Sequence, residues 1–245
     1  MTCEQRMRQR RDFLKLVFAG AVAGAASSGV EAAAAADAPP PPAPFAAGNV
    51  LDMARELAKS PFKAPKDALP DPFANLTYEQ YVAIRSRQGS ALWTTDNVGF
   101  ALEPLHRGFI FSTPMDIYVV DNGVAQKVVY DRSIFDFGAL KLPADVPDIG
   151  FSGFRVLNAV EGQGFQEVAI YQGASFFRAK ARGQIFGATA RGLTIHTGDP
   201  QGEEFPLFRS VWIEKPTLAA NALVIHALLD SASVAGAFRF TLHPG

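Results

Sequence analysis

Short apolar or alternating runs, separated by turn signals, fill this 245-residue chain from Trp93 onward. Two of them, Met115 to Val120 and Val124 to Tyr130, meet across the pair Asn122-Gly123. Asn-Gly is the strongest short-range hairpin signal, because a type I′ turn needs positive φ at both central residues. Further strands are predicted at Gly108 to Phe111, Gly153 to Leu157, Glu167 to Tyr171, Gly183 to Phe186, Leu193 to His196, Val211 to Glu214, Asn221 to Leu229 and Gly236 to Leu242. Regular short strands with little helix between them predict an all-β fold, a large antiparallel β-sandwich.

Two short helices are expected ahead of these strands. Apolar residues recur at helical spacing from Val50 to Ser60, and Pro61 ends that segment. Thr77 is positioned to cap a second helix that begins at Tyr78. Both helices are predicted to pack against a sheet.

Residues 1–36 have the organisation of an export signal. The segment Arg10 to Lys15 reads RRDFLK and resembles the twin-arginine signal R-R-x-F-L-K, although Gln9 stands where Ser or Thr is usual. An apolar run from Leu16 to Ala26 follows, which is short for a bilayer span, and the small residues from Ala32 to Ala36 suit a cleavage site. We therefore expect a cleaved signal peptide, delivery to the periplasm by the twin-arginine route, and no stable membrane span.

The rest of the chain divides into a linker and one predicted domain. Pro39 to Pro44 reads as a stiff extended spacer within a Pro/Ala-rich linker over 37–48, and the β-sandwich is expected over 49–245. The single cysteine, Cys3, precedes the apolar run, so disulfides and cysteine-ligated metals are excluded from the mature body. The formal net charge of −1 offers no general attraction to nucleic acid.

The stretch from Gly173 to Pro216 is the densest in aromatic rings, arginines and paired acids. Rings stack on the C–H faces of sugars while charged groups bond to the hydroxyls, so this composition suits a sugar-binding cleft. An ordinary sheet with rings inward and arginines outward gives the same pattern, and both interpretations stay open. The side chains that we select as candidates for lining a cleft are Arg178, Arg191, Glu204, Arg209 and Trp212.

No catalytic residue, metal site or cofactor is predicted in this chain. The four histidines are not within metal-ligand spacing of one another, and each is interpreted as structural: His106, His196, His226 and His243. The adjacent Glu203 and Glu204 are expected to point to opposite sides of an extended chain, so they do not form an acid/base pair with each other. At least one of them is expected to pair structurally with Arg191 or Arg209.

A resemblance to a known family is carried by segments that follow one another in a fixed order. They are Val120 to Gln126, Phe135 to Gly138, Gly150 to Val156, Gly173 to Ala179, Gly183 to Gly187, Ala190 to Leu193, Gln201 to Pro206, Trp212 to Pro216, Ala227 to Ser231 and His243 to Gly245. From Leu69 to Gly245, without large gaps, the chain resembles the osmoregulated periplasmic glucan biosynthesis proteins of types G and D. The twin-arginine leader favours the D type, because G-type members usually carry a general secretion signal.

The resemblance implies a sandwich of the galactose-mutarotase type, followed in the family by a small immunoglobulin-like domain. It also implies hydrolysis of β-1,2-linked glucan with inversion, which needs an acid and a base on opposite faces of the sugar with room for a water between them. In the family these carboxylates follow the segment that matches Pro244-Gly245, so no catalytic residue is carried over to this chain. We expect the chain to supply only the N-terminal part of the sandwich, without the later strands and the immunoglobulin-like domain. Its last strand, Ala237 to Leu242, is then either an uncovered edge or buried within the sheet.

Two function classes remain. The first is control of the glucose backbone of periplasmic glucans by β-1,2-glucan hydrolysis in the full-length protein. The alternative is a non-catalytic glucan-binding or assembly module that works with the membrane glucan synthase. Both predict affinity for β-1,2-glucan, but only the first predicts new reducing ends. A mutarotase-like isomerase is a third interpretation, and it rests on fold analogy alone.

Overall fold

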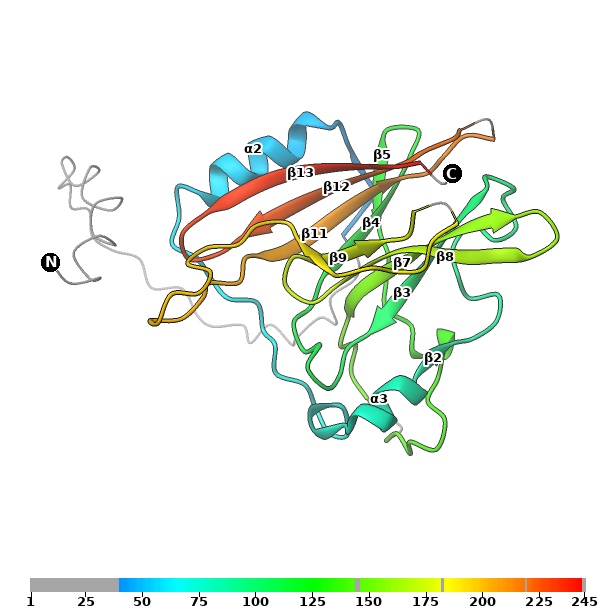
Figure 1. Ribbon diagram of the computed structural model, residues 1–245, viewed down its shortest axis with the longest axis horizontal. Coiled ribbons are helices and arrows are strands. Elements are labelled where there is room, and N and C mark those ends of the chain that lie inside the picture. Colours follow the sequence, from blue (N-terminus) through cyan, green and yellow to red (C-terminus); the bar gives the residue numbers. More distant parts are fainter. Residues whose placement is uncertain (1–39, 144–145, 182, 219, 244–245) are drawn as a thin grey trace, which may run out of the picture. The chain divides into compact units, whose positions relative to one another are not determined.

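The computed structural model describes residues 40–143, 146–181, 183–218 and 220–243, and the leader over 1–36 lies outside them. Over the described residues two β-sheets pack face to face, with an apolar core between them (Figure 1). Few residues are helical, and the strands of both sheets are mostly antiparallel. The prediction of an all-β sandwich with short N-terminal helices is confirmed.

The six-stranded sheet has the spatial order β1 (Ala43–Pro44), β5 (Val124–Lys127), β4 (Asp116–Asp121), β11 (Leu207–Glu214), β12 (Leu223–Asp230) and β13 (Ala235–Leu242). The five-stranded sheet has the order β10 (Ala190–Arg191), β9 (Phe176–Ala179), β8 (Gly164–Gln172), β7 (Phe151–Val160) and β3 (Phe100–His106). A small third sheet pairs β2 (Arg85–Ser86) with β6 (Phe135–Asp136). The helical elements are α2 (Gly48–Leu57), η2 (Phe73–Asn75), α3 (Tyr78–Ala83) and η3 (Arg132–Ile134).

The predicted hairpin joins β4 and β5. Asn122 and Gly123 both have positive φ, 49° and 77°, as the type I′ turn requires. The other neighbour of β4 is β11, and this pair runs parallel, so the six-stranded sheet is mixed rather than purely antiparallel. Parallel pairing needs a crossover, and strands β7 to β10 of the five-stranded sheet supply it because they fall between β5 and β11 in the sequence.

Aromatic rings from both sheets meet in the core. Phe154 of β7 stacks on Tyr171 of β8 with ring centroids 4.9 Å apart, and Phe240 of β13 meets Tyr171 edge-on at 5.2 Å. All three side chains point inward because alternate residues of a strand face the same side of a sheet. The contacts tie the five-stranded sheet to the six-stranded one.

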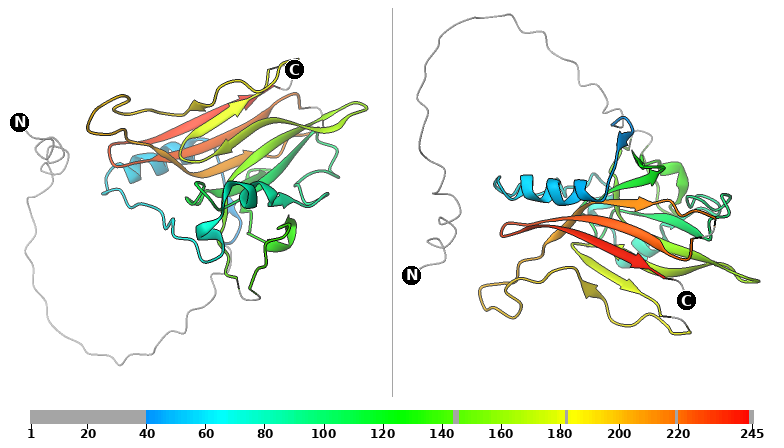
Figure 2. Two further views of the ribbon diagram at one scale, coloured as in Figure 1. Left: turned by 60° about the horizontal axis from the view of Figure 1, so that its bottom comes forward. Right: turned by 90° about the horizontal axis from the view of Figure 1, so that it is seen from above.

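Helix α2 covers the outer face of the six-stranded sheet. Its Val50 and Ala54 are buried in a cluster with Trp212 and Leu228, and Figure 2 shows the helix lying along that face. Helix α3 begins as predicted, with a capping box in which the Thr77 hydroxyl accepts from the Gln80 backbone N–H and the Thr77 backbone N–H donates to Gln80 Oε1.

The predicted spacer differs from the structure at its C-terminal end. Ala43 and Pro44 pair with β5, and the Phe45 ring stacks on Trp212 at 5.7 Å. The folded unit therefore includes residues that were assigned to a linker over 37–48. Proline is compatible with this position because β1 is an edge strand, where a missing N–H is tolerated.

Three predicted strands are wrong, and two strands longer than two residues were missed. Gly108 to Phe111 forms a tight turn closed by reciprocal backbone bonds, Gly183 to Phe186 contains no strand, and Leu193 to His196 holds only an isolated bridge at Ile195. The missed strands are β9 and β3, and Pro104 interrupts the sequence pattern of β3. Among the described strands β3 pairs only with β7, and its other side holds just an isolated bridge between Leu102 and Leu92, so β3 is an edge strand and accommodates a proline. At the other edge of the six-stranded sheet, β13 pairs only with β12 among the described residues.

Candidate functional site

A row of polar side chains crosses the outer face of the five-stranded sheet. The strand register places four residues side by side across β3, β7, β8 and β9, and they are Glu103, Arg155, Ile170 and Arg178. Their neighbours along the strands, such as Leu102 and Val156, are buried in the core, so this row faces away from it.

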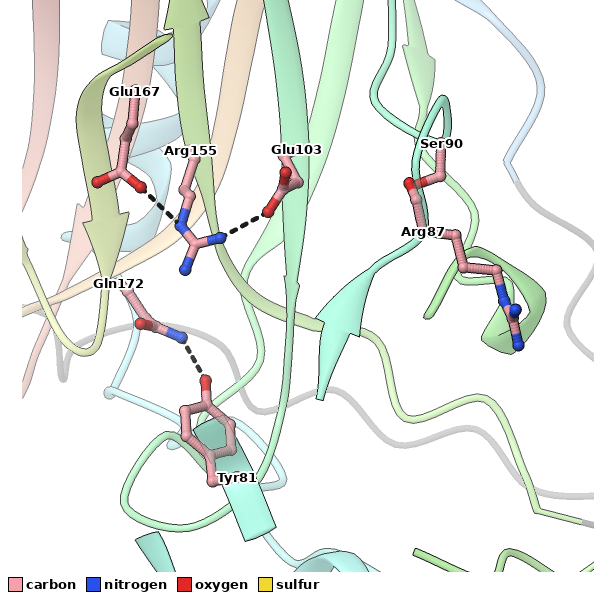
Figure 3. Close-up of polar contacts among 7 residues, drawn as sticks. All are labelled: Tyr81, Arg87, Ser90, Glu103, Arg155, Glu167 and Gln172. Atoms are coloured by element: carbon pink, nitrogen blue, oxygen red, sulfur yellow. Dashed lines mark hydrogen bonds and ion pairs between the residues drawn. The ribbon is translucent and has the colours of Figure 1, made fainter. Parts of the chain in front are cut away.

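Arg155 lies between two carboxylates in this row (Figure 3). Its Nη1 donates to Glu103 Oε1 at 2.6 Å, and its Nε lies 3.0 Å from Glu167 Oε2. The second contact is an ion pair only, since the buried Arg155 Nε makes no hydrogen bond with acceptable geometry. Both carboxylates thus turn an oxygen toward the same guanidinium. That arrangement is a charge cluster, not an acid and a base opposed across a water.

Next to this row, Tyr81 of α3 reaches the end of β8. Gln172 Nε2 donates to the Tyr81 hydroxyl at 2.7 Å, as Figure 3 shows, and also to Ser152 Oγ at 2.8 Å. Burial raises the pKa of the Tyr81 phenol, while the neighbouring Ser152 and Gln172 side chains act in the opposite direction. The net upward shift keeps the phenol protonated at neutral pH, so its proton is available for a hydrogen bond.

A pocket of about 640 Å³ opens beside these residues. Gln172 and Ile170 of β8 and Arg178 of β9 line it, and its walls include Phe111 of the tight turn and Phe205 before β11. A mostly apolar, ring-lined cavity of this size with a few polar groups is typical of small-molecule sites. The pocket is therefore our candidate functional site.

Arg191 adjoins the pocket through its two aromatic walls. Its guanidinium carbon lies 5.7 Å from the Phe176 ring centroid and 5.6 Å from that of Phe205, within cation–π range. It also forms an ion pair with Glu203, which confirms the predicted structural pairing of one of the two adjacent acids. These contacts fix the two rings on one side of the pocket.

Of the candidate residues predicted from sequence, the structure brings Arg178 and Arg191 together. Arg178 lines the pocket and stacks over the Phe186 ring at 4.8 Å, while Arg191 contacts the aromatic wall. Glu204 instead accepts bonds from the Ser233 backbone N–H at 2.9 Å and hydroxyl at 2.6 Å. Burial raises the pKa of Glu204, but hydrogen bonds from Ser231 and Ser233 outweigh it and hold the pKa below its usual value.

Arg209 and Trp212 do not line this pocket. Arg209 Nη1 pairs with the buried Asp230 at 2.7 Å and donates to the Lys63 carbonyl at 3.0 Å. Trp212 is 6% exposed, beneath α2, and stacks on Tyr118 with centroids 5.2 Å apart. Its ring packs between a helix and a sheet and is closed to any ligand.

Sequence reasoning missed the polar residues that bond to one another beside the pocket-lining residues Ile170 and Gln172. Glu103 and Arg155 are far apart in the chain, and only the pairing of β3 with β7 makes them neighbours. Tyr81 lies in the second predicted helix, and nothing in the sequence indicates that its hydroxyl bonds to Gln172 of β8. An Arg and a Glu at facing positions of two strands would have been the signal, but the missed β3 concealed it.

A second pocket of about 590 Å³ lies beside the β4–β5 turn. Lys215 is its cation, and Nζ lies 2.7 Å from Asp96 and 3.6 Å from Asp121, which neutralise it. No aromatic ring lines this second pocket in the described residues. Within the same residues, no cluster of three His, Cys, Asp or Glu side chains is arranged to hold a metal ion. The pocket beside Gln172 is the better candidate for a sugar ligand.

Comparison with known proteins identifies the family of this chain. Residues 45–245 match a family described as "Periplasmic glucan biosynthesis protein, MdoG". The chain belongs to this family. A relative from Rhodopseudomonas palustris, named glucans biosynthesis protein G, is 46% identical over 204 residues, which cover 83% of this chain and 41% of the relative. Proteins of the same name are 44% identical in Vibrio cholerae, over 80% of this chain and 36% of theirs, and 43% identical in Shewanella oneidensis, over 82% and 37%.

The chain thus spans about two fifths of the length of these curated relatives. Their names are of the G type, while the preference for the D type rests on a leader outside the described residues and stays a prediction. None of the described helices is long and apolar enough to cross a bilayer. The matched family is described as one of periplasmic glucan biosynthesis proteins.

Proposed function

We propose that the pocket beside Gln172 binds the β-1,2-linked glucose backbone of periplasmic glucans. The observation that carries the proposal is the pairing of aromatic walls, Phe111, Phe176 and Phe205, with the polar groups of Gln172 and Arg178 around one cavity. Aromatic faces accept the C–H faces of glucose units, and the polar groups bond to their hydroxyls. The family's role in periplasmic glucan biosynthesis supplies the substrate class.

The activity we propose for the full-length protein is hydrolysis of β-1,2-glucan with inversion, after export by the twin-arginine route. An inverting glycosidase needs two carboxyl groups separated by room for a water. The acids described near the pocket have structural partners: Glu103 and Glu167 bond to Arg155, and Glu203 bonds to Arg191. In this proposal the pocket contributes binding, and none of these three acids is the acid or the base of the reaction.

A second candidate is a non-catalytic glucan-binding or assembly module that works with the membrane glucan synthase. The same occupied carboxylates favour it, because a binding face needs no free acid. Both candidates require the pocket to hold glucan, and they differ only in whether the bond is broken.

Calorimetric titration of the purified protein with β-1,2-glucan, and with an α-1,6-glucan as control, tests the shared claim. We expect saturable heat with the first polymer alone. A reducing-end assay on the same samples then separates the candidates, since only hydrolysis generates new ends. Absence of binding to β-1,2-glucan would overturn both.

A further inference from the structure

The amide of Gln172 is held from two sides at the edge of the candidate pocket. Its Nε2 donates to the Tyr81 hydroxyl at 2.7 Å and to Ser152 Oγ at 2.8 Å. A side-chain amide nitrogen carries two hydrogens, so both are used in these bonds. The other end of the amide, Oε1, receives no hydrogen bond from the described residues, and Gln172 lines the pocket.

The hydrogens of the two hydroxyls determine which way this amide faces. Tyr81 donates its single hydrogen to the His106 carbonyl at 3.1 Å, and Ser152 donates its own to the same carbonyl at 2.7 Å. Each hydroxyl has one hydrogen, so toward Gln172 each acts only as an acceptor. The group that faces them must therefore be the amide nitrogen.

The reversed amide would break this arrangement. With Oε1 turned inward, Tyr81 and Ser152 would both have to donate to it, and the His106 carbonyl would lose both of their hydrogen bonds. An unmade bond to a buried polar group is costly, so the network selects one orientation. Figure 3 shows the result, with the Gln172 nitrogen toward Tyr81 and the oxygen turned away from it.

We propose that Gln172 Oε1 is a pre-oriented acceptor that recognises a hydroxyl of the bound sugar. The inference rests on the proposed function and adds a selection rule to it. A ligand must offer an O–H donor at this point, whereas an ether oxygen or a hydrogen there leaves Oε1 unpaired. Sites built to bond a hydroxyl discriminate strongly against analogues that lack it.

Tyr81 is the positioning residue in this scheme. Its ring lies 5.4 Å from that of Phe111, and its helix is fixed by the capping box at Thr77. The Tyr81 ring thus holds helix α3 in place by packing, and the Tyr81 hydroxyl holds the Gln172 amide by hydrogen bonding. A Tyr81→Phe substitution removes only the second role.

The test compares Tyr81→Phe with Tyr78→Phe by titration of the purified protein with β-1,2-glucan. Tyr78 is on the same helix and is 60% exposed, so its hydroxyl has no part in the network. Tyr81→Phe leaves Ser152 as the only group that holds the amide nitrogen, so we expect this variant to bind up to about tenfold more weakly, the equivalent of one hydrogen bond. Tyr78→Phe and wild type should bind alike, and Gln172→Leu should lose at least as much affinity as Tyr81→Phe.

Side-chain amide resonances give a readout that needs no ligand. In wild type we expect the two Gln172 amide protons to exchange slowly with solvent, and in Tyr81→Phe to exchange faster. If wild type binds glucan and Tyr81→Phe binds it equally well, the inference is overturned and the proposed function stands. If wild type does not bind glucan at all, the proposed function fails first and the sugar-recognition role fails with it.

Discussion

The outer faces of the two sheets are built from the same kind of alternating strand, yet one is closed and the other is open. On the six-stranded sheet, α2 covers Trp212, Tyr118 and Leu228, and the cluster is apolar. On the five-stranded sheet, Arg155 and Gln172 lie on a face that carries charges, hydrogen-bonded amides and a ring-walled pocket. What covers a strand, rather than the strand's own pattern, decides whether its outward residues are core or site.

Trp212 and Phe205 illustrate the lesson, since both come from the same aromatic-rich stretch. Trp212 is 6% exposed and serves as a packing residue, while Phe205 is 49% exposed and forms a wall of the pocket. Aromatic content alone does not distinguish them. Substitutions on the closed face are expected to change stability, and substitutions on the open face are expected to change glucan binding.

The largest effect is expected for Trp212→Ala on the closed face. The substitution removes the stacks on Phe45 and Tyr118 and leaves a cavity under α2. Loss of a buried large aromatic costs about 3–5 kcal/mol, so chemical denaturation should show a drop of this size. Glucan affinity per folded molecule should be unchanged. A stable Trp212→Ala protein that had lost glucan binding would place this residue in the site after all.

A pH effect is expected on the side of the five-stranded sheet. Burial lowers the pKa of His106 to about 4, against 6.5 for the free side chain. Between these values the unfolded chain binds the extra proton, so the stability present above pH 6.5 is lost as the pH falls toward 4. The full difference is on the order of 3 kcal/mol.

Denaturation at pH 7, 5.5 and 4.5 measures this loss, and an NMR titration of the ring gives the pKa directly. His196→Gln is the matched control, because that imidazole is exposed and the variant should follow wild type. A His106→Gln protein should show a flatter dependence over the same range. An unaltered slope in His106→Gln would mean that another group carries the effect.

The close approach of β7 and β8, in the sheet that carries the open face, is tested by adding a methyl group at Gly153. At Gly153 a Cβ would lie 2.0 Å from the Tyr171 carbonyl oxygen, so Gly153→Ala forces β7 and β8 apart. Overpacking of this kind costs about 1–3 kcal/mol, measurable as a lower denaturation midpoint. Gly48→Ala in α2 is the control, since no atom lies within 4 Å of its Cβ position. Equal stability of the two variants would contradict the close approach of β7 and β8.

The smallest change in stability is expected for Phe205→Ala on the open face. The side chain is half exposed, and substitutions at such positions usually change stability by less than about 0.5 kcal/mol. Glucan affinity should nevertheless fall severalfold, because a wall of the pocket and a ring beside Arg191 are removed. Unchanged affinity in calorimetry would exclude this ring from the site.

Much of the fold follows from local signals in the sequence. Asn122-Gly123 specifies its hairpin through backbone conformation, and Thr77 specifies the start of α3 through its side chain. Two of the failures have a common cause, since Pro104 hides an edge strand and Pro44 hides a pairing with β5. Whether a proline is tolerated depends on which strand has a free edge, and that is a property of the assembled sheet.

The candidate site was less predictable than the fold. Arg178 and Arg191 could be selected because rings and arginines are close in sequence there. The cluster around Arg155 and the network around Gln172 join β3, α3 and β8, so they exist only after strand register is set. Composition identifies candidates for such a site, but the partners come from long-range pairing.

The central claim is that glucan binds on the open face of the five-stranded sheet and not on the closed face. Hydrogen–deuterium exchange of the protein with and without β-1,2-glucan tests this most directly. We expect slower exchange in peptides covering the turn at 108–113 and strands β8 and β9, and no change in α2 or β12. Protection confined to α2 and β12, with none at the pocket, would contradict the account.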